Sequence, residues 1–111
     1  MIDSREALTE NLRALTSADQ FAPSVGTSFR TSWGTEDSTS LELISAEACG
    51  KGKSRGSARE PFSLVFRAAN AQYYLPQGVY LLEHEKHDKL PIFLVPIGPD
   101  EIGMRFEAIF N

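Results

Sequence analysis

The chain has 111 residues, of which 41% are hydrophobic and 23% are charged, so its composition is that of a globular protein and excludes a disordered one. Its formal net charge of −4 gives no general attraction to nucleic acid or to an anionic membrane. Its single cysteine, Cys49, cannot form an internal disulfide and fits a reducing compartment. The acidic N-terminus is not a secretory signal, and no window reaches the ~20 apolar residues of a membrane-spanning helix. We therefore expect one soluble, cytoplasmic domain over residues 1–111, with neither nucleic acid nor membrane as its partner.

The first predicted element is a helix over residues 4–15. Leu8, Leu12 and Leu15 form an apolar stripe at spacings of four and three. Because the stripe is narrow, the helix should lie on the outside of another element. A second capping signal at residues 17–20 predicts a short helical turn after it.

Six segments between residues 27 and 110 have the residue patterns of strands, and apolar and polar side chains alternate in the first, third and sixth of them. In the second segment the alternation slips in phase at Leu43 and Ile44, which predicts a β-bulge there. In the fifth, Pro96 cannot donate a ladder hydrogen bond, so it should lie at a strand end or a bulge. The predicted strands are 27–33, 40–48, 61–67, 79–83, 92–97 and 105–110, and the β domain spans 27–110.

The fourth and fifth predicted strands are apolar on both faces. Val79 and Leu81 share one face, while Tyr80 and Leu82 share the other. Strands of this kind are typically central and covered on both sides, here by the rolled sheet and the N-terminal helix; a subunit interface is the competing explanation. No βαβ alternation is visible, so the chain predicts a mainly β (α+β) fold: an antiparallel roll or small barrel of about six strands with an N-terminal helix.

Four blocks of the sequence, PFSLVFR, PQGVYLLEH, IFLVPIGPD and MRFEAIFN, resemble a family of small uncharacterised bacterial proteins. With the segment ADQFAPSVGTSFR, the resemblance covers the chain from about Thr16 onward. It implies a bacterial source, a compact β domain and no established activity, and it supplies no functional residues. The basic loop 50–59 is longer and more charged than the family pattern, and His87 replaces an ordinary turn residue. A role for either feature would be particular to this chain.

The segment His84-Glu85-Lys86-His87-Asp88 is the main candidate for a metal site, because imidazole and carboxylate groups bind transition metals. Its spacing is one residue short of the His-Glu-x-x-His pattern of zinc proteases, and we expect residues 84–88 to be a hairpin loop, not a helix. We interpret the segment as a solvated loop and predict no metal; His84 and His87 are the residues that a metal would use.

The glycine- and lysine-rich segment after Cys49 does not match a phosphate-binding loop, because Glu47 stands where that motif needs glycine. It does place four cations together in a loop that could contact phosphate or an acidic partner, although a solvated loop is the preferred interpretation. These cations are Lys51, Lys53, Arg55 and Arg59.

Two further features admit a functional interpretation. Tyr73 and Tyr74 could form an exposed recognition pair, since aromatic residues are enriched in interfaces, or could close one end of the barrel. Cys49 could be activated by the neighbouring lysines, but a catalytic thiol also needs a positioned base. A lone, partly buried thiol is the preferred interpretation.

Because no set of polar residues converges, the sequence favours a non-enzymatic structural or protein-interaction module that needs no cofactor and acts in a homodimer or a larger assembly. An enzyme using His84, His87 or Cys49 ranks third. The second hypothesis is a small-ligand-binding β-barrel, although barrels of few strands usually fill their interiors with side chains. Its cavity would be lined by Phe62, Phe66, Tyr80, Phe93 and Phe106.

Overall fold

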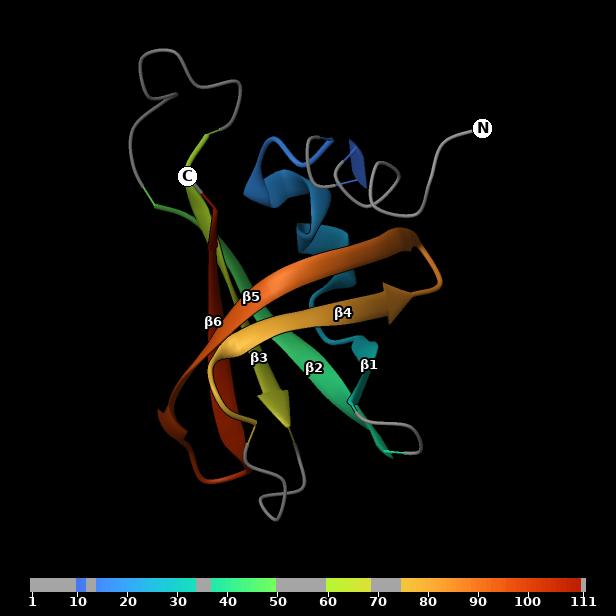
Figure 1. Ribbon diagram of the computed structural model, residues 1–111. Coiled ribbons are helices and arrows are strands. Elements are labelled where there is room, and N and C mark those ends of the chain that lie inside the picture. Colours follow the sequence, from blue (N-terminus) through green and yellow to red (C-terminus); the bar gives the residue numbers. More distant parts are fainter. Residues whose placement is uncertain (1–9, 12–13, 34–36, 50–59, 69–74, 111) are drawn as a thin grey trace.

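The computed structural model describes residues 10–11, 14–33, 37–49, 60–68 and 75–110, and in these residues six strands close into one barrel. The strand order is β1-β2-β3-β6-β5-β4, and β4 returns to pair with β1 (Figure 1). Every neighbouring pair is antiparallel, which confirms the predicted fold class. The bounds are β1 Ser28–Trp33, β2 Asp37–Ala48, β3 Phe62–Ala68, β4 Gly78–His84, β5 His87–Pro99 and β6 Met104–Phe110.

The hairpin predicted at residues 84–88 is present, but its loop is shorter than predicted. β4 continues to His84 and β5 begins at His87, so the two histidines pair across a turn of only two residues, Glu85 and Lys86. The longer loop was predicted because Lys89 and Pro91 flank Leu90 and hide the alternation with which β5 begins. β2 likewise starts at Asp37, earlier than predicted, because its polar first residues continue the ladder with β1.

Both predicted irregularities are present. The register between β2 and β3 shifts between Leu43 and Ser45, which confirms the bulge. Leu43 is buried before the shift, and Ala46 packs against the core after it. In β5 the register against β6 shifts between Pro96 and Gly98, so the proline lies at a bulge, as expected. Gly98 has a φ of +102°, a conformation that suits glycine better than other residues.

Aromatic and leucine side chains from all six strands fill the barrel interior. Phe62 and Phe66 of β3 and Phe106 of β6 are fully buried, and Tyr80 packs at the edge of this core. Phe93, the fifth residue of the predicted ligand cavity, lies on the outside with 49% of its surface exposed, so that cavity is not formed as predicted. The other fully buried large side chains are Phe21, Phe29, Thr31, Leu41, Leu43, Leu64, Leu82, Ile92 and Leu94.

Burial of β4 and β5 on both faces is also wrong within this chain. Val79 is 67% exposed and Leu81 is exposed beside it, whereas Leu82 is fully buried. The reason is geometric: a single sheet closed on itself has one interior, and every second residue of each strand must point outward.

Two short 3-10 helices, η1 Ala18–Gln20 and η2 Ala22–Ser24, pack near one end of the barrel (Figure 1). The predicted capping box at their start is present, and Phe21 between them is fully buried. Of the predicted helix over residues 4–15, Glu10 and Asn11 are helical, while most of the rest, including Leu8 and Leu12, lies outside the described residues. In the part of the chain that the structure describes, no helix has the length and apolar character needed to cross a membrane.

Phe110→Ala tests the role of the last strand in the core. The Phe110 side chain is 7% exposed and stacks on Phe62 with ring centroids 4.6 Å apart. We expect its truncation to lower the free energy of unfolding by ~3 kcal/mol or more, since it leaves a cavity in a filled interior. Ile109→Ala, at the exposed neighbouring position, should change it by less than about 0.5 kcal/mol. Equal denaturant midpoints for Phe110→Ala and the unmodified chain would contradict the assignment.

Candidate functional site

The structure describes some of the predicted site residues. His84 and His87 are described and lie together, with ring centroids 5.0 Å apart. Cys49 is exposed, so the expectation of a partly buried thiol is wrong; the residue follows the last residue of β2, beyond the core. The remaining candidates lie outside the described residues: Lys51, Lys53, Arg55, Arg59, Tyr73 and Tyr74.

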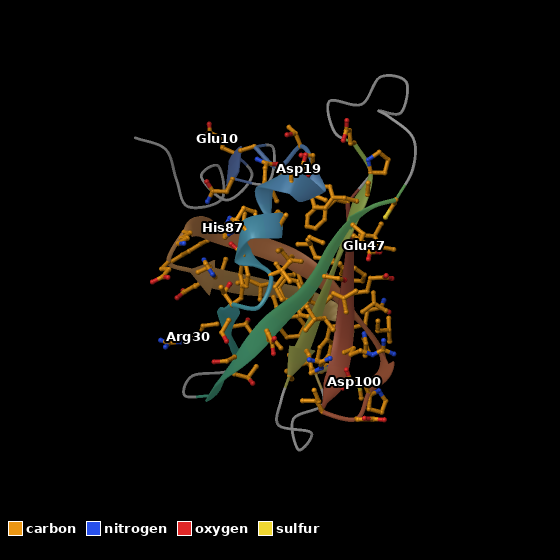
Figure 2. All side chains as sticks on the ribbon, turned by 180° about the vertical axis from the view of Figure 1, so that it is seen from behind. Glu10, Asp19, Arg30, Glu47, His87 and Asp100 are labelled. Atoms are coloured by element: carbon orange, nitrogen blue, oxygen red, sulfur yellow. The ribbon has the colours of Figure 1, made fainter. Side chains whose placement is uncertain are left out.

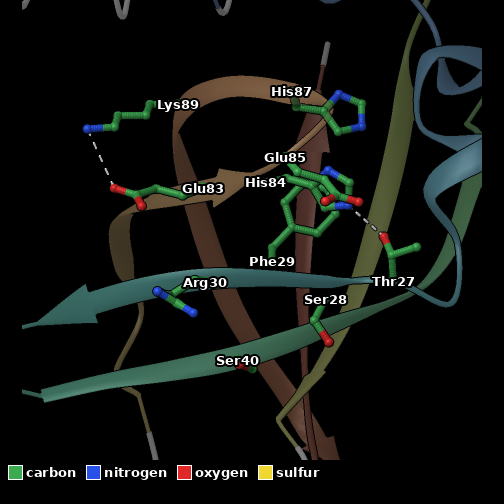
Figure 3. Close-up of a pocket in the computed structure, with 10 residues that line it drawn as sticks. All are labelled: Thr27, Ser28, Phe29, Arg30, Ser40, Glu83, His84, Glu85, His87 and Lys89. Atoms are coloured by element: carbon green, nitrogen blue, oxygen red, sulfur yellow. Dashed lines mark hydrogen bonds and ion pairs between the residues drawn. The ribbon is translucent and has the colours of Figure 1, made fainter.

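The histidines lie where β1 and β4 separate. These strands pair at only two positions, Arg30 with Glu83 and Thr31 with Leu82. Continued by one residue, this register would pair Phe29 with His84, but the ladder has ended there. The separation leaves a cleft of about 630 Å³, which we call the seam cleft (Figure 3). It is lined by Thr27, Ser28, Phe29, Arg30, Ser40, Glu83, His84, Glu85, His87 and Lys89.

A chain of hydrogen bonds through His84 closes one end of the seam cleft. The Lys86 N–H donates to His84 Nδ1 at 3.0 Å, so Nδ1 is an acceptor and the ring proton lies on Nε2. Nε2 lies 2.8 Å from Thr27 Oγ1 and donates to it, while the Thr27 hydroxyl donates to the Ser24 carbonyl oxygen at 2.6 Å. These contacts join the hairpin turn to the segment before β1, where the strand ladder no longer does.

His87 makes a parallel connection at a deeper level. Its Nε2 lies 2.9 Å from Ser24 Oγ, and its ring stacks on Phe21 at a centroid distance of 4.9 Å. A hydroxyl beside an imidazole is also the arrangement of an activated nucleophile. Ser24, however, is only 3% exposed and does not line the cleft, so a substrate would not reach its oxygen. We therefore interpret the pair as structural.

The geometry of the histidines bears on the metal hypothesis. Each Nε2 already contacts a hydroxyl, Thr27 for His84 and Ser24 for His87. Among the described residues, no three His, Cys, Asp or Glu side chains lie close enough together to hold a metal ion. In this region the histidines join elements of the fold and do not converge on an open coordination site.

The charged side chains of the seam cleft differ in how they are paired. Glu83 and Lys89 face each other across β4 and β5, with a carboxylate oxygen 3.7 Å from Nζ. Arg30 and Glu85 are exposed, and neither forms an ion pair with a described residue. Figure 2 shows Arg30 extending away from the ribbon. Within the described residues, Arg30 and Glu85 are thus the charged side chains of the cleft that have no ion-pair partner.

Sequence reasoning did not identify Arg30, Ser28 or Ser40 as site residues. Arginine and serine are ordinary residues on the outward face of a strand. Here they line a cleft only because β1 and β4, two strands distant in sequence, diverge beside them. The pairing of β1 with β4 ends at Arg30 and Glu83, and only the three-dimensional structure shows where this pairing ends.

Next to the seam cleft, the outward face of β4 and β5 forms an apolar surface, which we call the apolar stripe. Val79 lies directly opposite Phe93, and Leu81 lies opposite Pro91. Ile109 of β6 is also exposed. Val95 pairs with Glu107, and continuing this antiparallel register by two residues brings Phe93 opposite Ile109. The Glu83–Lys89 pair borders the stripe on the side of the hairpin turn.

At the opposite end of the barrel, Asp100 holds the turn between β5 and β6 (Figure 2). Arg67 Nε donates to Asp100 Oδ2 at 2.8 Å, and the Gly103 and Ile102 N–H groups donate to Oδ1 at 2.9 Å. These bonds hold the pKa of Asp100 far below its ordinary value of 3.8, with the Arg67 hydrogen bond as the largest cause. The group is structural, since its acceptor atoms are all used within the fold.

Comparison with known proteins identifies a family and no activity. A family described as "Domain of unknown function (DUF6916)" matches residues 16–110, which agrees with the extent of the resemblance seen in the sequence. Neither a curated protein nor a solved structure matches the chain.

Thr27→Val tests the hydrogen bonds through His84. The substitution keeps the side-chain shape but leaves His84 Nε2 and the Ser24 carbonyl without their shared hydroxyl, so we expect a loss of about 1 kcal/mol of stability. The amide of Lys86 should also exchange with solvent faster, because the ring that accepts from it is less fixed. Thr39→Val on β2, where the hydroxyl makes no hydrogen bond to a described residue, is the control. Unchanged exchange at Lys86 would refute the arrangement.

Asp100→Asn tests the charge at the far turn. Because the folded pKa lies below the unfolded one, the unfolded state takes up the proton first, and acid favours unfolding. The stabilisation by Asp100 is therefore present above about pH 4 and is lost as the pH falls through and below that value. We expect the stability difference between the unmodified chain and Asp100→Asn to shrink between about pH 5 and pH 2 in denaturant titrations. A stability difference that stays constant over this pH range would contradict the arrangement.

Proposed function

We propose that this chain, which belongs to the DUF6916 family, a domain of unknown function, is a non-enzymatic protein-interaction module. Because the family supplies no activity, the proposal rests on the surface chemistry of the chain. Its docking surface is the apolar stripe on β4 and β5. The observation that carries this proposal is the direct pairing of two exposed large side chains, Val79 and Phe93, on the outside of a barrel with a filled core.

The stripe has the composition of an interface centre. Single exposed apolar residues are normal, but here two adjacent cross-strand pairs, Val79 with Phe93 and Leu81 with Pro91, form one surface. A charged pair, Glu83 with Lys89, borders it. An apolar centre with a polar rim and few central charges is the usual anatomy of a protein–protein interface.

Among the described residues, no other element covers the stripe. The segment of the 3-10 helices packs elsewhere, because its Phe21 contacts Phe62 in the core and His87 at the end of the β4–β5 hairpin. The partner is therefore another polypeptide, either a second copy or a different subunit of a larger assembly. The exposed free thiol of Cys49 supports a reducing, cytoplasmic setting for this assembly.

The double substitution Val79→Thr with Phe93→Thr tests the proposal. Threonine keeps the β-propensity of both positions while removing apolar surface, so the melting temperature should change little. The variant should lose self-association in sedimentation velocity, or lose a protein that the unmodified chain retains from a lysate of the native cell.

The matched control is Ile102→Thr, which removes an equally exposed apolar side chain (61%) from the turn after β5. This variant should keep whichever association the unmodified chain shows. If association is absent, or is equally strong in the double variant and the control, the stripe is not a docking surface.

A further inference from the structure

We propose that the seam cleft binds an extended segment of the partner protein as an added strand on the edge of β1. The segment carries an acidic side chain that meets Arg30 and a basic side chain that meets Glu85. This inference rests on the proposed function, because it names the chemistry of the segment by which the partner is recognised.

The edge of β1 makes an added strand the fitting occupant. On one side, β2 pairs with Ser28 and Phe29, and this ladder extends through the Thr27 carbonyl, which accepts from the Leu43 N–H at 3.0 Å. On the other side, the pairing with β4 ends at Arg30, so Ser28 and Phe29 have no β4 residue opposite them. Among the described residues, this short stretch of the β1 edge has no neighbouring strand, and such an edge is the template that β-augmentation uses.

The cleft beside this edge has room for a short peptide. Its volume of about 630 Å³ lies within the range of ligand sites. Phe29, His84 and His87 contribute aromatic rings to its lining, and the Thr27–His84 hydrogen bond spans the gap at one end (Figure 3). This bond and the buried Ser24–His87 contact tie the hairpin end to the segment before β1, so the position of this end of the cleft is fixed by the fold.

The charges favour a segment that bears both signs. Arg30 lies at the end where the strands still pair, and Glu85 lies at the hairpin turn. Two cations, Arg30 and Lys89, balance two carboxylates, Glu83 and Glu85, so the cleft has no net attraction for a polyanion such as a nucleotide. Since Glu83 and Lys89 satisfy each other, the two unpaired groups are left to select a ligand.

Hydroxyl groups complete the site. Ser28 and Ser40 line the cleft on the same side as Arg30, and each can donate or accept a hydrogen bond. A guanidinium with adjacent hydroxyls suits a carboxylate, which accepts from both kinds of donor. The acidic side chain of the segment therefore belongs at the Arg30 end.

The test uses fluorescein-labelled octapeptides of alternating threonine and valine as probes. One carries a glutamate followed by a lysine, a second carries them in the opposite order, and a third carries no charge. Binding to the full chain is measured by fluorescence anisotropy. We expect one charge order to bind at least about tenfold more tightly than the uncharged peptide, and N-methylation of alternate amides on one edge to remove that binding.

Variants of the two unpaired groups make the test specific. Arg30→Glu and Glu85→Lys should each weaken the preferred peptide by about tenfold, while Arg30→Lys should retain most of the binding. The double variant with both reversals should prefer the opposite charge order. Glu47→Lys, an equal charge change at an exposed β2 position outside the cleft, is the control and should bind as the unmodified chain does.

The outcomes separate this inference from the proposed function. If all three peptides bind equally, if none binds, or if the reversals have no more effect than Glu47→Lys, the cleft is not a peptide site. The apolar stripe is tested independently, because Val79 and Phe93 do not line the cleft. Association that is lost in the stripe variant but unaffected by Arg30→Glu would overturn this inference and leave the proposed function standing.

Discussion

The structure depends on the closure of a single antiparallel sheet by hydrogen bonds. Closure satisfies the backbone of the outermost strands and creates one interior, which the side chains of alternate residues fill. Leu82, Ile92 and Leu94 lie in this interior, and the same alternation directs their neighbours Leu81 and Phe93 outward. The exposure of Val79 and Phe93 in the described residues therefore follows from the alternation of a closed sheet.

Closure is incomplete in one place, and the candidate site lies there. Between β1 and β4 the backbone ladder holds two residue pairs, after which side chains take over. His84 contacts Thr27 and His87 contacts Ser24, so imidazole–hydroxyl bonds replace the backbone bonds that the diverging strands no longer make. The histidines, which in the sequence suggest metal chemistry, instead keep the walls of the cleft in place. Their position leaves the edge of β1 accessible beside them.

Much of the fold could be predicted from the sequence because its alternation is regular. Phe62, Leu64 and Phe66 gave the inward face of β3, and the phase slip at Leu43 located a bulge. Two-sided burial of β4 and β5 was predicted wrongly, since local pattern does not reveal whether a sheet closes on itself or is covered by a second layer. The pairing of His84 with His87 was missed because charged residues and Pro91 mask the start of β5.

The candidate site could be predicted far less well. The sequence shows His84, Glu85 and His87 as a cluster that suggests metal binding, but the contacts of the two histidines do not support a metal site. No sequence pattern marks Arg30 as a site residue, because its position in the cleft depends on the divergence of two strands that are far apart in the chain. A site of this kind is defined by the point at which two strands stop pairing. The apolar–polar alternation within one strand does not show where that point lies.

The narrow junction between β1 and β4 also has a consequence for how the molecule forms. Arg30 and Glu83 are distant in sequence, whereas β4, β5 and β6 join consecutive neighbours, so the junction carries the greater entropic cost of loop closure for only two residue pairs. We expect it to be the last contact made during folding and the first released in native-state fluctuations. Its opening would free the first strand from the hairpin while the meander of the last three strands stays intact.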